Sequence, residues 1–511
     1  MTAIEQPDTT ALDPRLYLDP DGTAREQQAI FARTWQLAGH VADERGDRAR
    51  LIRRAVGQRR GLAQPRLPAR PAGADDSRSA SARSRATSSP GGGTRPDRSA
   101  ARASGSSRSG SAVIESQRSS PRSARAAIDS DHIMRLITKS GHRMTAIEQP
   151  DTTALDPRLY VDPDGTAREQ AAIFARSWQL AGHTADLAAP GRYVGVQVGS
   201  ESAIAIRGED GELRAFRNVC RHRAARLREG RGDCGKALRC PYHGWTYRPD
   251  GQLIGVPEGR GFRGLDKDQL GLMPARVETF AGLVFVNLDL DAPPLAGTLG
   301  GLAERLAPYG IERLERFSES TSSQPANWKI VADNYLEGYH VPIAHPSLMR
   351  LLDYQRYTVE VGDGYAFFEA PLRAKPSGNR LERAYQKLVK PMPGLGAADE
   401  RVWRYVYLWP NTTIDLYPDQ VTTWQINPRG VEATHDVWAC YRAADPSPAM
   451  RAVQRLNHRL NADVADEDAA LVARVQAGMA TTGWTPGPLG EREAAVAWFA
   501  DHVRTALEAA A

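Results

Sequence analysis

Short strand-like segments bounded by turn residues dominate the chain after residue 190, and they predict a protein built mainly from β-sheet. A first group precedes and follows two turn-rich stretches, at Tyr193–Val198, Ser202–Ile206 and Gly282–Asn287. A second group lies further on, at Arg404–Trp409, Thr412–Tyr417, Gln420–Ile426 and Ala433–Cys440. A helical pattern occupies Glu491–Ala509. Strands in groups with separate helical segments predict the α+β class.

The start of this pattern occurs twice. Residues 1–40 recur at 144–183, and both copies begin with methionine. Only three positions differ: Leu18 against Val161, Gln28 against Ala171 and Thr34 against Ser177. The match stops after His40, whereas a well-patterned chain follows His183. Functional inferences therefore rest on residues 144–511.

The insert at 41–143 is rich in Arg, Ser, Ala, Pro and Gly and contains no aromatic residue or cysteine. Its net charge is +13, from 22 Lys and Arg against 9 Asp and Glu, whereas the whole chain carries +5. Such a composition cannot bury enough apolar surface to offset its ordering entropy, so we expect disorder over 1–143. Our hypothesis is a partial duplication with Met144 as the functional start. Mass spectrometry of the native gene product tests it, since retention of 1–143 would refute it.

Bulk properties restrict the class of protein. The 511 residues suffice for two or three domains, and no apolar run approaches the ~20 residues of a membrane span. The N-terminus lacks the pattern of a signal peptide, so we expect a cytoplasmic protein. Cys220, Cys234 and Cys240 cluster while Cys440 stands alone, which favours metal binding over disulfides. Cys234 and Cys440 fit buried small apolar residues better.

The strongest motif pairs two loops that each offer one Cys and one His. Cys220-Arg-His222 is followed after seventeen residues by Cys240-Pro-Tyr-His243. Two thiolates on one iron and two imidazoles on the other would hold a [2Fe–2S] cluster of raised potential. The alternative is a structural zinc site, but zinc modules usually pair Cys with Cys and His with His.

A second motif suggests a mononuclear metal. Asp333, Glu337 and His340 are spaced to share one face of a helix predicted from Asn327 to about Pro342, and His345 follows. Two histidines and one carboxylate leave open positions for O₂ on a non-haem iron. The late acidic stretch offers Asp463, Asp466 and Asp468 as the carboxylate. Taken alone, acidic residues at the start of a helix are commonly present only because they interact favourably with the helix dipole.

These segments resemble the α subunits of Rieske non-haem iron oxygenases. Cys240-Pro-Tyr-His-Gly-Trp245 is similar to the family's second cluster loop, and Asp333 to His345 matches its catalytic motif Asp/Glu-x3-Asp-x2-His-x4-His. The resemblance implies that Cys220, His222, Cys240 and His243 hold the cluster and that His340, His345 and Asp468 hold Fe(II). It makes Glu337 the bridge from His340 to His243 of the next subunit, where most ring-oxidising members carry Asp. Asp333 and Asn334 are predicted with Glu337 as catalytic residues.

The resemblance also implies the architecture and the partners. It places a leading segment at 144–180 with a helix at Ala167–Leu180, a β-rich Rieske domain at 181–295 and a helix-grip (START-like) catalytic domain at 296–511. Head-to-tail homotrimers would pass electrons between subunits. No Gly-x-Gly-x-x-Gly lies at a strand-to-helix turn, so NAD(P)H electrons must come from a partner reductase, directly or through a ferredoxin. We expect neither nucleic acid nor a membrane as a partner.

Two substrate classes compete. The family's default is aromatic ring hydroxylation, by mono- or dioxygenation. The alternative is oxidation of a quaternary ammonium compound of the choline, carnitine or betaine type, because Glu337 and the surrounding Asp333–Pro342 resemble that branch. Its cation would need an aromatic cage. The candidates for such a cage, or for ordinary core, are Tyr354, Tyr357, Phe367, Phe368, Trp403, Tyr405, Tyr407, Trp409, Tyr417, Trp424 and Trp438.

Two further interpretations stay open at this point. A Rieske electron-transfer protein with a ligand-binding helix-grip module would lack the second iron, and replacing His340 and His345 would leave its metal content unchanged. The Arg-rich insert could bind nucleic acid through phosphates. Loss of salt-sensitive DNA binding on deleting 41–143 would be needed to support that role.

Overall fold

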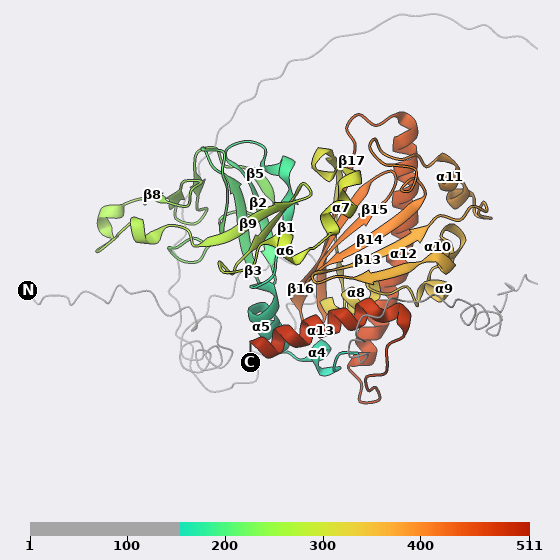
Figure 1. The fold of residues 1–511 in the computed structure, drawn as a ribbon. Helices are drawn as coiled ribbons and strands as arrows, with labels where there is room; N and C mark the ends of the chain where they lie inside the picture. The colour runs from blue at the N-terminus through green and yellow to red at the C-terminus, as the bar shows by residue number, and fades with distance from the viewer. Residues whose placement is uncertain (1–153, 511) are drawn as a thin grey trace, which may run out of the picture. The chain divides into compact units, whose positions relative to one another are not determined.

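The computed structural model describes residues 154–510, all of which belong to one compact unit. The predicted disorder over 1–143 lies outside these residues. The described chain forms two β-rich domains in succession (Figure 1). In the part of the chain that is described, no helix is long and apolar enough to cross a bilayer.

The first domain contains a seven-stranded antiparallel sheet in the order β1-β10-β9-β4-β3-β2-β5 and a three-stranded sheet in the order β6-β7-β8. Alternate residues of β2 point inward, so Val194, Val196 and Val198 are buried. The strand bounds are β1 Gln179–His183, β2 Arg192–Val198, β3 Glu201–Arg207, β4 Leu213–Arg217, β5 Arg231–Asp233, β6 Leu238–Arg239, β7 Thr246–Tyr247, β8 Leu253–Gly255, β9 Pro274–Phe280 and β10 Leu283–Asn287.

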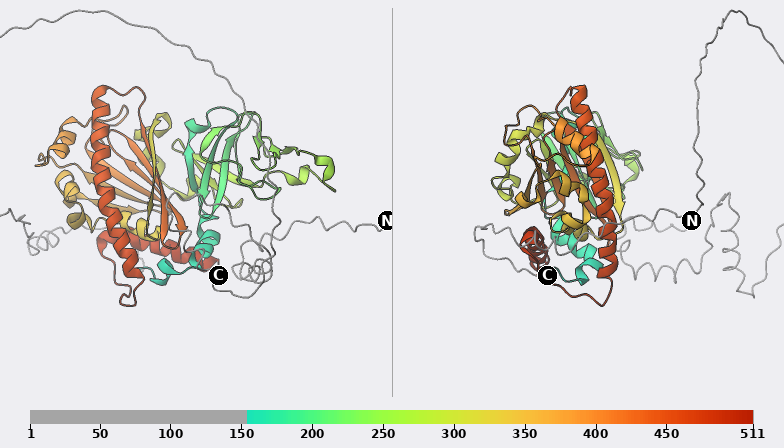
Figure 2. Two further views of the ribbon diagram at one scale, coloured as in Figure 1. Left: turned by 180° about the vertical axis from the view of Figure 1, so that it is seen from behind. Right: turned by 90° about the vertical axis from the view of Figure 1, so that its right-hand side faces the viewer.

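The second domain is a seven-stranded antiparallel sheet with helices packed beside it. Its order is β11-β17-β16-β15-β14-β13-β12, and the 32-residue helix α12 runs alongside it (Figure 2). The strands are β11 Glu315–Gln324, β12 Thr358–Val361, β13 Tyr365–Pro371, β14 Val402–Leu408, β15 Thr412–Leu416, β16 Val421–Gly430 and β17 Ala433–Arg442. The helices are α6 Leu295–Thr298, α7 Leu302–Leu306, α8 Trp328–Tyr335, α9 Val341–Ala344, α10 Pro346–Leu351, α11 Arg380–Leu388, α12 Pro448–Met479 and α13 Ala494–Ala509. This arrangement confirms the expected helix-grip class, with α12 as the long helix.

The leading segment differs from the single helix expected over Ala167–Leu180. It forms α4 (Arg158–Val161), α5 (Gly165–Glu169) and a π-helical turn (Gln170–Phe174), and Gln179 already belongs to β1. Pairing with β10, from Gln179 opposite Val286 to His183 opposite Leu283, outweighs helix propensity there. The segment packs against α8 and α13 of the second domain rather than standing alone.

The predicted helix from Asn327 to Pro342 is also wrong in extent. Asn327 caps α8 through Lys329 N–H at 3.1 Å, but the helix ends at Tyr335. A side chain at Gly338 would place its Cβ 2.7 Å from the Tyr357 ring, so the chain turns there against that ring. Glu337 and His340 therefore lie in the turn after α8, not on one helical face with Asp333.

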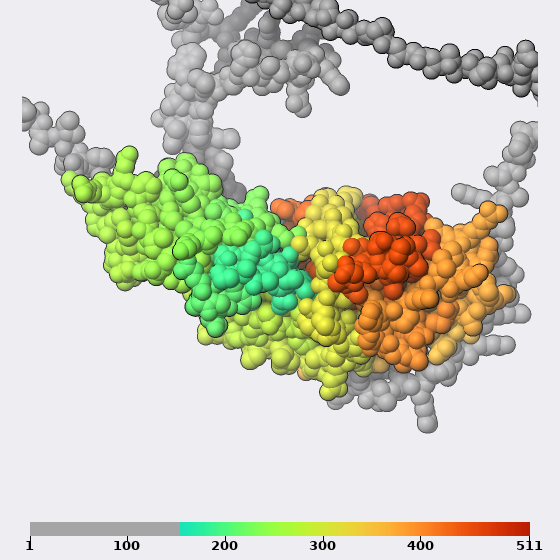
Figure 3. Space-filling view, turned by 90° about the horizontal axis from the view of Figure 1, so that it is seen from above, coloured from blue at the N-terminus to red at the C-terminus, as the bar shows by residue number. Residues whose placement is uncertain are grey.

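Polar contacts join the two domains within the chain. Asp186 accepts a hydrogen bond from Arg316 of β11 at 2.7 Å, and Gln425 of β16 donates to the Leu180 carbonyl at 2.6 Å. In Figure 3 the yellow segment that includes β11 lies between the green first domain and the orange and red residues of the second. These contacts hold the two sheets as one unit.

Candidate functional site

The first candidate site lies on two loops of the first domain. Cys220 and His222 follow β4, while Cys240 and His243 follow β6. Both thiols are buried, and the two imidazole rings lie 4.7 Å apart. The structure therefore brings the two Cys together and the two His together, as predicted for a cluster with thiolates on one iron and imidazoles on the other.

The surroundings of these four residues fit a metal cluster. Burial raises the pKa of the Cys220 thiol, and the neighbouring Cys240 adds to the rise, so a pair of thiolates here would be favoured by a bound metal cation. The Tyr247 hydroxyl lies 3.3 Å from the Cys220 sulfur. His222 stacks on Trp245, and its buried Nδ1 atom has no hydrogen-bond partner. An unpaired buried nitrogen in a fixed ring is the arrangement expected of a metal ligand.

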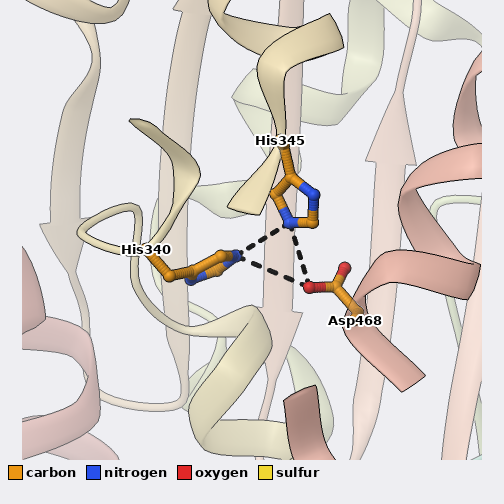
Figure 4. A group of neighbouring side chains, drawn as sticks. All are labelled: His340, His345 and Asp468. Carbon is orange, nitrogen blue, oxygen red and sulfur yellow. Dashed lines mark hydrogen bonds and ion pairs between the residues drawn. The ribbon is translucent and has the colours of Figure 1, made fainter. Parts of the chain in front are cut away.

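The second candidate site is a triad of two histidines and one carboxylate (Figure 4). His345 Nε2 lies 3.0 Å from His340 Nε2 and 3.0 Å from Asp468 Oδ1, and the remaining separation is 3.6 Å. His340 lies just before α9, His345 lies between α9 and α10, and Asp468 comes from the middle of α12. Their converging atoms match the two-histidine, one-carboxylate set of non-haem iron.

The opposite nitrogen of each imidazole is held by a glutamate. Glu467 Oε2 lies 2.7 Å from His345 Nδ1, and Glu337 contacts His340 Nδ1. A carboxylate behind each ring fixes the tautomer and directs Nε2 to the metal. The Asn334 amide donates to Asp468 Oδ1 at 2.9 Å, so Asn334 positions the third ligand.

The alternatives for the carboxylate lie elsewhere. Asp463 pairs with Arg459 on the surface of α12, and Asp466 lines the adjoining cavity without joining the triad. Asp333 faces away from the ligands, toward the leading segment, where it accepts a hydrogen bond from Tyr160 at 2.6 Å. Burial raises the pKa of Asp333 to about 7. Its catalytic role stays a prediction. Sequence reasoning missed Glu467 as a functional residue, although its place beside Asp468 was a signal.

A cavity of about 380 Å³ adjoins the triad, and its wall includes the three candidate ligands. Of the predicted cage candidates, seven line it: Tyr354, Tyr357, Phe368, Tyr405, Tyr417, Trp424 and Trp438. Phe367, Trp403 and Tyr407 belong to buried core clusters and do not line the cavity, and Trp409 packs against one of these clusters. Phe368, Tyr417 and Trp424 belong both to the core clusters and to the cavity wall. The cavity's sheet face is made by neighbours across five strands, Phe368, Tyr405, Asp415, Thr422 and Cys440.

Family comparisons agree with this geometry. Residues 177–270 match the Rieske [2Fe-2S] domain, and residues 311–509 match the catalytic domain of the ring hydroxylating alpha subunit. The chain belongs to the family of Rieske oxygenase alpha subunits. The resemblance stated from the motifs is thereby confirmed, together with the two iron cofactors.

The similar proteins include oxygenase subunits of monooxygenases and the alpha subunit of biphenyl 2,3-dioxygenase from Rhodococcus jostii, which is 38% identical over 37% of this chain and 42% of its own length. The oxygenase subunit of glycine betaine monooxygenase from Chromohalobacter salexigens is 31% identical over 70% of this chain and 87% of its own length. The oxygenase subunit of carnitine monooxygenase from Acinetobacter baumannii is 37% identical, and the match spans 41% of this chain and 57% of that protein. The crystal structure of the quaternary ammonium Rieske monooxygenase CntA with an inhibitor superposes with a TM-score of 0.61 at 26% identity, covering 71% of this chain and 99% of CntA.

Proposed function

We propose that this chain is the terminal oxygenase of a multicomponent cytoplasmic enzyme and that its substrate is an organic ammonium compound. Within the family, this favours the quaternary ammonium branch over aromatic ring hydroxylation. The observation that carries the choice is the cavity beside the triad. Its described lining combines Tyr335 and the seven cage candidates with a buried carboxylate, Asp415. Aromatic faces attract quaternary ammonium ions. The monooxygenases named among the similar proteins support the same class.

The reaction replaces a C–H bond on a carbon next to nitrogen by C–OH. O₂ takes up two electrons and two protons; one oxygen atom enters the product and the other leaves as water. The carbinolamine then breaks its C–N bond to give an amine and a carbonyl compound. Iron held by His340, His345 and Asp468 would supply the activation of O₂. The chain's own residues orient the ligands, through Glu337, Glu467 and Asn334, and enclose the substrate in an aromatic wall.

The test is a product analysis. The chain is reconstituted with iron, reduced and given hydrogen peroxide, which bypasses the partner reductase, together with a panel of ammonium compounds and a panel of arenes. Mass spectrometry should find amine and carbonyl products from the first panel. Hydroxylated arenes without amine products would return the protein to ring hydroxylation. A double variant, His340→Ala with His345→Ala, is the control and should form neither, with its mononuclear iron lost. Unchanged iron content would favour the electron-transfer alternative.

We also propose that electrons, delivered by a reductase, enter at the cluster of one subunit and reach the iron of the next in a homotrimer. Surface chemistry at both ends supports such a contact. His243 is exposed at the tip of its loop, next to the 57%-exposed ring of Tyr242. Beside the triad, Tyr339 is 56% and Ile343 is 70% exposed. Apolar side chains exposed beside both metal sites are suited to burial between subunits. Glu337 would bridge the two ligand sets there.

Mixed trimers test the transfer between subunits. A Cys220→Ser chain lacks a working cluster, and a His345→Ala chain lacks a working iron site. Each alone should be inactive with the reductase, whereas mixed trimers, verified by native mass spectrometry, should recover activity because one donates to the other. Absence of recovery in verified mixed trimers would refute transfer between chains. Adding Glu337→Gln to the chain that keeps its iron should abolish the recovered activity without removing either metal.

A further inference from the structure

Asp415 lies near the end of β15, the central strand of the second domain's sheet, with its side chain in the cavity wall. It is 6% exposed, and its neighbours across the sheet are Tyr405 on β14 and Thr422 on β16. Its carboxylate accepts hydrogen bonds from the hydroxyl groups of Tyr335 at 2.6 Å and Tyr417 at 3.4 Å. Burial raises the pKa of Asp415 to about 6, and hydroxyl donors oppose that rise.

None of the partners of Asp415 among the described residues is a cation. A carboxylate placed in an apolar cavity without a positive partner is costly, so it is usually paired or kept neutral. A ligand could supply the positive charge, because the Asp415 carboxylate lines a cavity large enough for a small molecule.

The aromatic rings converge on the same place. The Tyr335 ring lies 6.2 Å from Phe368, 6.4 Å from Tyr405 and 5.8 Å from Trp424, in edge-to-face arrangements. Trp424 stacks on Trp438 at 4.3 Å. Tyr335 also directly follows Asn334, whose amide holds Asp468. Asp415 and Asp468 thus contact consecutive residues of α8, Tyr335 and Asn334.

The cavity offers nothing comparable for an anion. Among the described residues that line it, there is no lysine or arginine, and His458 is exposed. Its acidic residues include Asp415 and Asp466, in addition to Asp468 of the triad and Glu337 behind His340. Glu319, at the rim, is already paired with Arg231 at 2.5 Å. Arg492 stands behind the wall, with its guanidinium 4.4 Å from the ring centre of Tyr354. A zwitterion would bring its carboxylate toward Asp415 and Asp466, in a cavity whose described lining holds no lysine or arginine to pair with it.

We propose that the cavity selects a small organic cation that carries no anionic group, and that Asp415 is the specificity-determining residue that balances its charge. The inference deepens the proposed function, since it takes the ammonium class as given and narrows it to cations of the choline kind. It predicts that the zwitterions of the carnitine and betaine kind are poor ligands.

Binding is measured by calorimetry and by tryptophan fluorescence on the full chain, loaded with cluster and Fe(II) and kept without O₂. Choline is the cationic probe, 3,3-dimethyl-1-butanol is its neutral isostere, and carnitine and glycine betaine are the zwitterions. We expect choline to bind at least about ten-fold more tightly than the other three, because only choline combines the positive charge that Asp415 attracts with the absence of an anionic group. This comparison needs no variant.

Asp415→Asn keeps the size of the side chain and an oxygen that accepts from Tyr335. It should weaken choline at least about ten-fold and leave the neutral isostere unchanged. Asp419→Asn is the matched control: Asp419 is equally buried and bonded to Tyr385 at 2.7 Å, but it does not line the cavity, so choline binding should be unaffected.

The outcomes separate the two proposals. Tight binding of a zwitterion overturns this inference but leaves the ammonium function standing, and Arg492→Ala then tests the anionic anchor. A preference for choline that survives in Asp415→Asn overturns the role of Asp415. Binding and hydroxylation of arenes with no binding of any cation overturns both proposals.

Discussion

The buried ion pair between Glu169 and Lys329 ties the leading segment to α8, and its loss should have a large effect that depends on pH. The Lys329 side chain has no exposed surface, and Glu169, which contacts the Lys329 ammonium, also accepts from the Trp328 indole at 2.7 Å. Burial lowers the pKa of Lys329, and Glu169 opposes that shift. In Glu169→Gln the amide oxygen still accepts from the indole, so the change removes mainly the negative charge.

Without that charge Lys329 should lose its proton in the folded protein. Deprotonating an amine of pKa about 10.4 at pH 7 costs about 5 kcal/mol, and at pH 9 about 2 kcal/mol. The unfolded chain then binds one more proton than the folded one, so the free energy of unfolding rises with pH by about 1.4 kcal/mol per unit. Glu169→Gln should therefore destabilise by up to about 5 kcal/mol at pH 7, and by about 3 kcal/mol less at pH 9.

The assay is urea denaturation followed by pulse proteolysis at pH 7 and pH 9. Because Glu26 of the first copy matches Glu169, each variant is made both in the full chain and in a chain that begins at Met144. The double variant with Lys329→Met removes both charges of the pair and should lose less stability than Glu169→Gln at pH 7, with a smaller dependence on pH. A loss for Glu169→Gln that is equal at pH 7 and pH 9, or below about 1 kcal/mol at pH 7, would refute this reasoning.

Three further changes have defined outcomes. Burial raises the pKa of Asp419 to about 6 in the folded protein, above that of an unfolded aspartate, so this group lowers the free energy of unfolding as pH rises. The free energy of unfolding of Asp419→Asn, measured in urea, should therefore exceed that of the wild type by about 1 kcal/mol more at pH 8 than at pH 5. Glu467→Gln weakens the orientation of His345 and should lower Fe(II) affinity about ten-fold by competition with a chelator, whereas a change under two-fold would show that Glu467 does not support the ligand. Cys240→Ser should abolish the visible absorbance of the cluster while His345→Ala retains it, and loss in both variants would mean that the two sites fold as one.

The grouping of the candidate ligands could be predicted from sequence because each motif is local. One tight loop holds Cys220 with His222, and another holds Cys240 with His243. Only the four-residue helix α9 separates His340 from His345. The choice of Asp468 among three acids needed the family pattern, and the structure places it beside both histidines. The helix drawn through Glu337 failed because the close approach of Gly338 to Tyr357 depends on a strand hairpin nearly twenty residues away.

Contacts between distant parts of the chain were beyond the sequence. Glu169 and Lys329 are 160 positions apart, and nothing local marks either as half of a buried pair. Asp415 looks like one more polar residue in a strand that begins with Thr412 and Thr413, and its importance emerges only when β14, β16 and α8 surround it. The division of the aromatic residues into cavity wall and core likewise requires the pairing register, since both kinds occupy similar strand positions.

Helix α12 makes three contacts that join separate parts of the second domain. Asn461 accepts from Tyr417 at 3.1 Å, Asp468 meets the two histidines, and Gln476 accepts from the backbone N–H of Asn327 at 2.7 Å. Asn461, Asp468 and Gln476 are seven and eight residues apart. Each interval is close to two full helical turns, so the three side chains lie on one side of α12. A single inserted residue between Asn461 and Asp468 would swing the iron ligand and the cap of α8 about 100° around the axis together. An insertion of seven residues would keep the angle but move the later residues about 10 Å along the axis. The spacing along α12 is therefore under the same constraint as the identity of the candidate iron ligand.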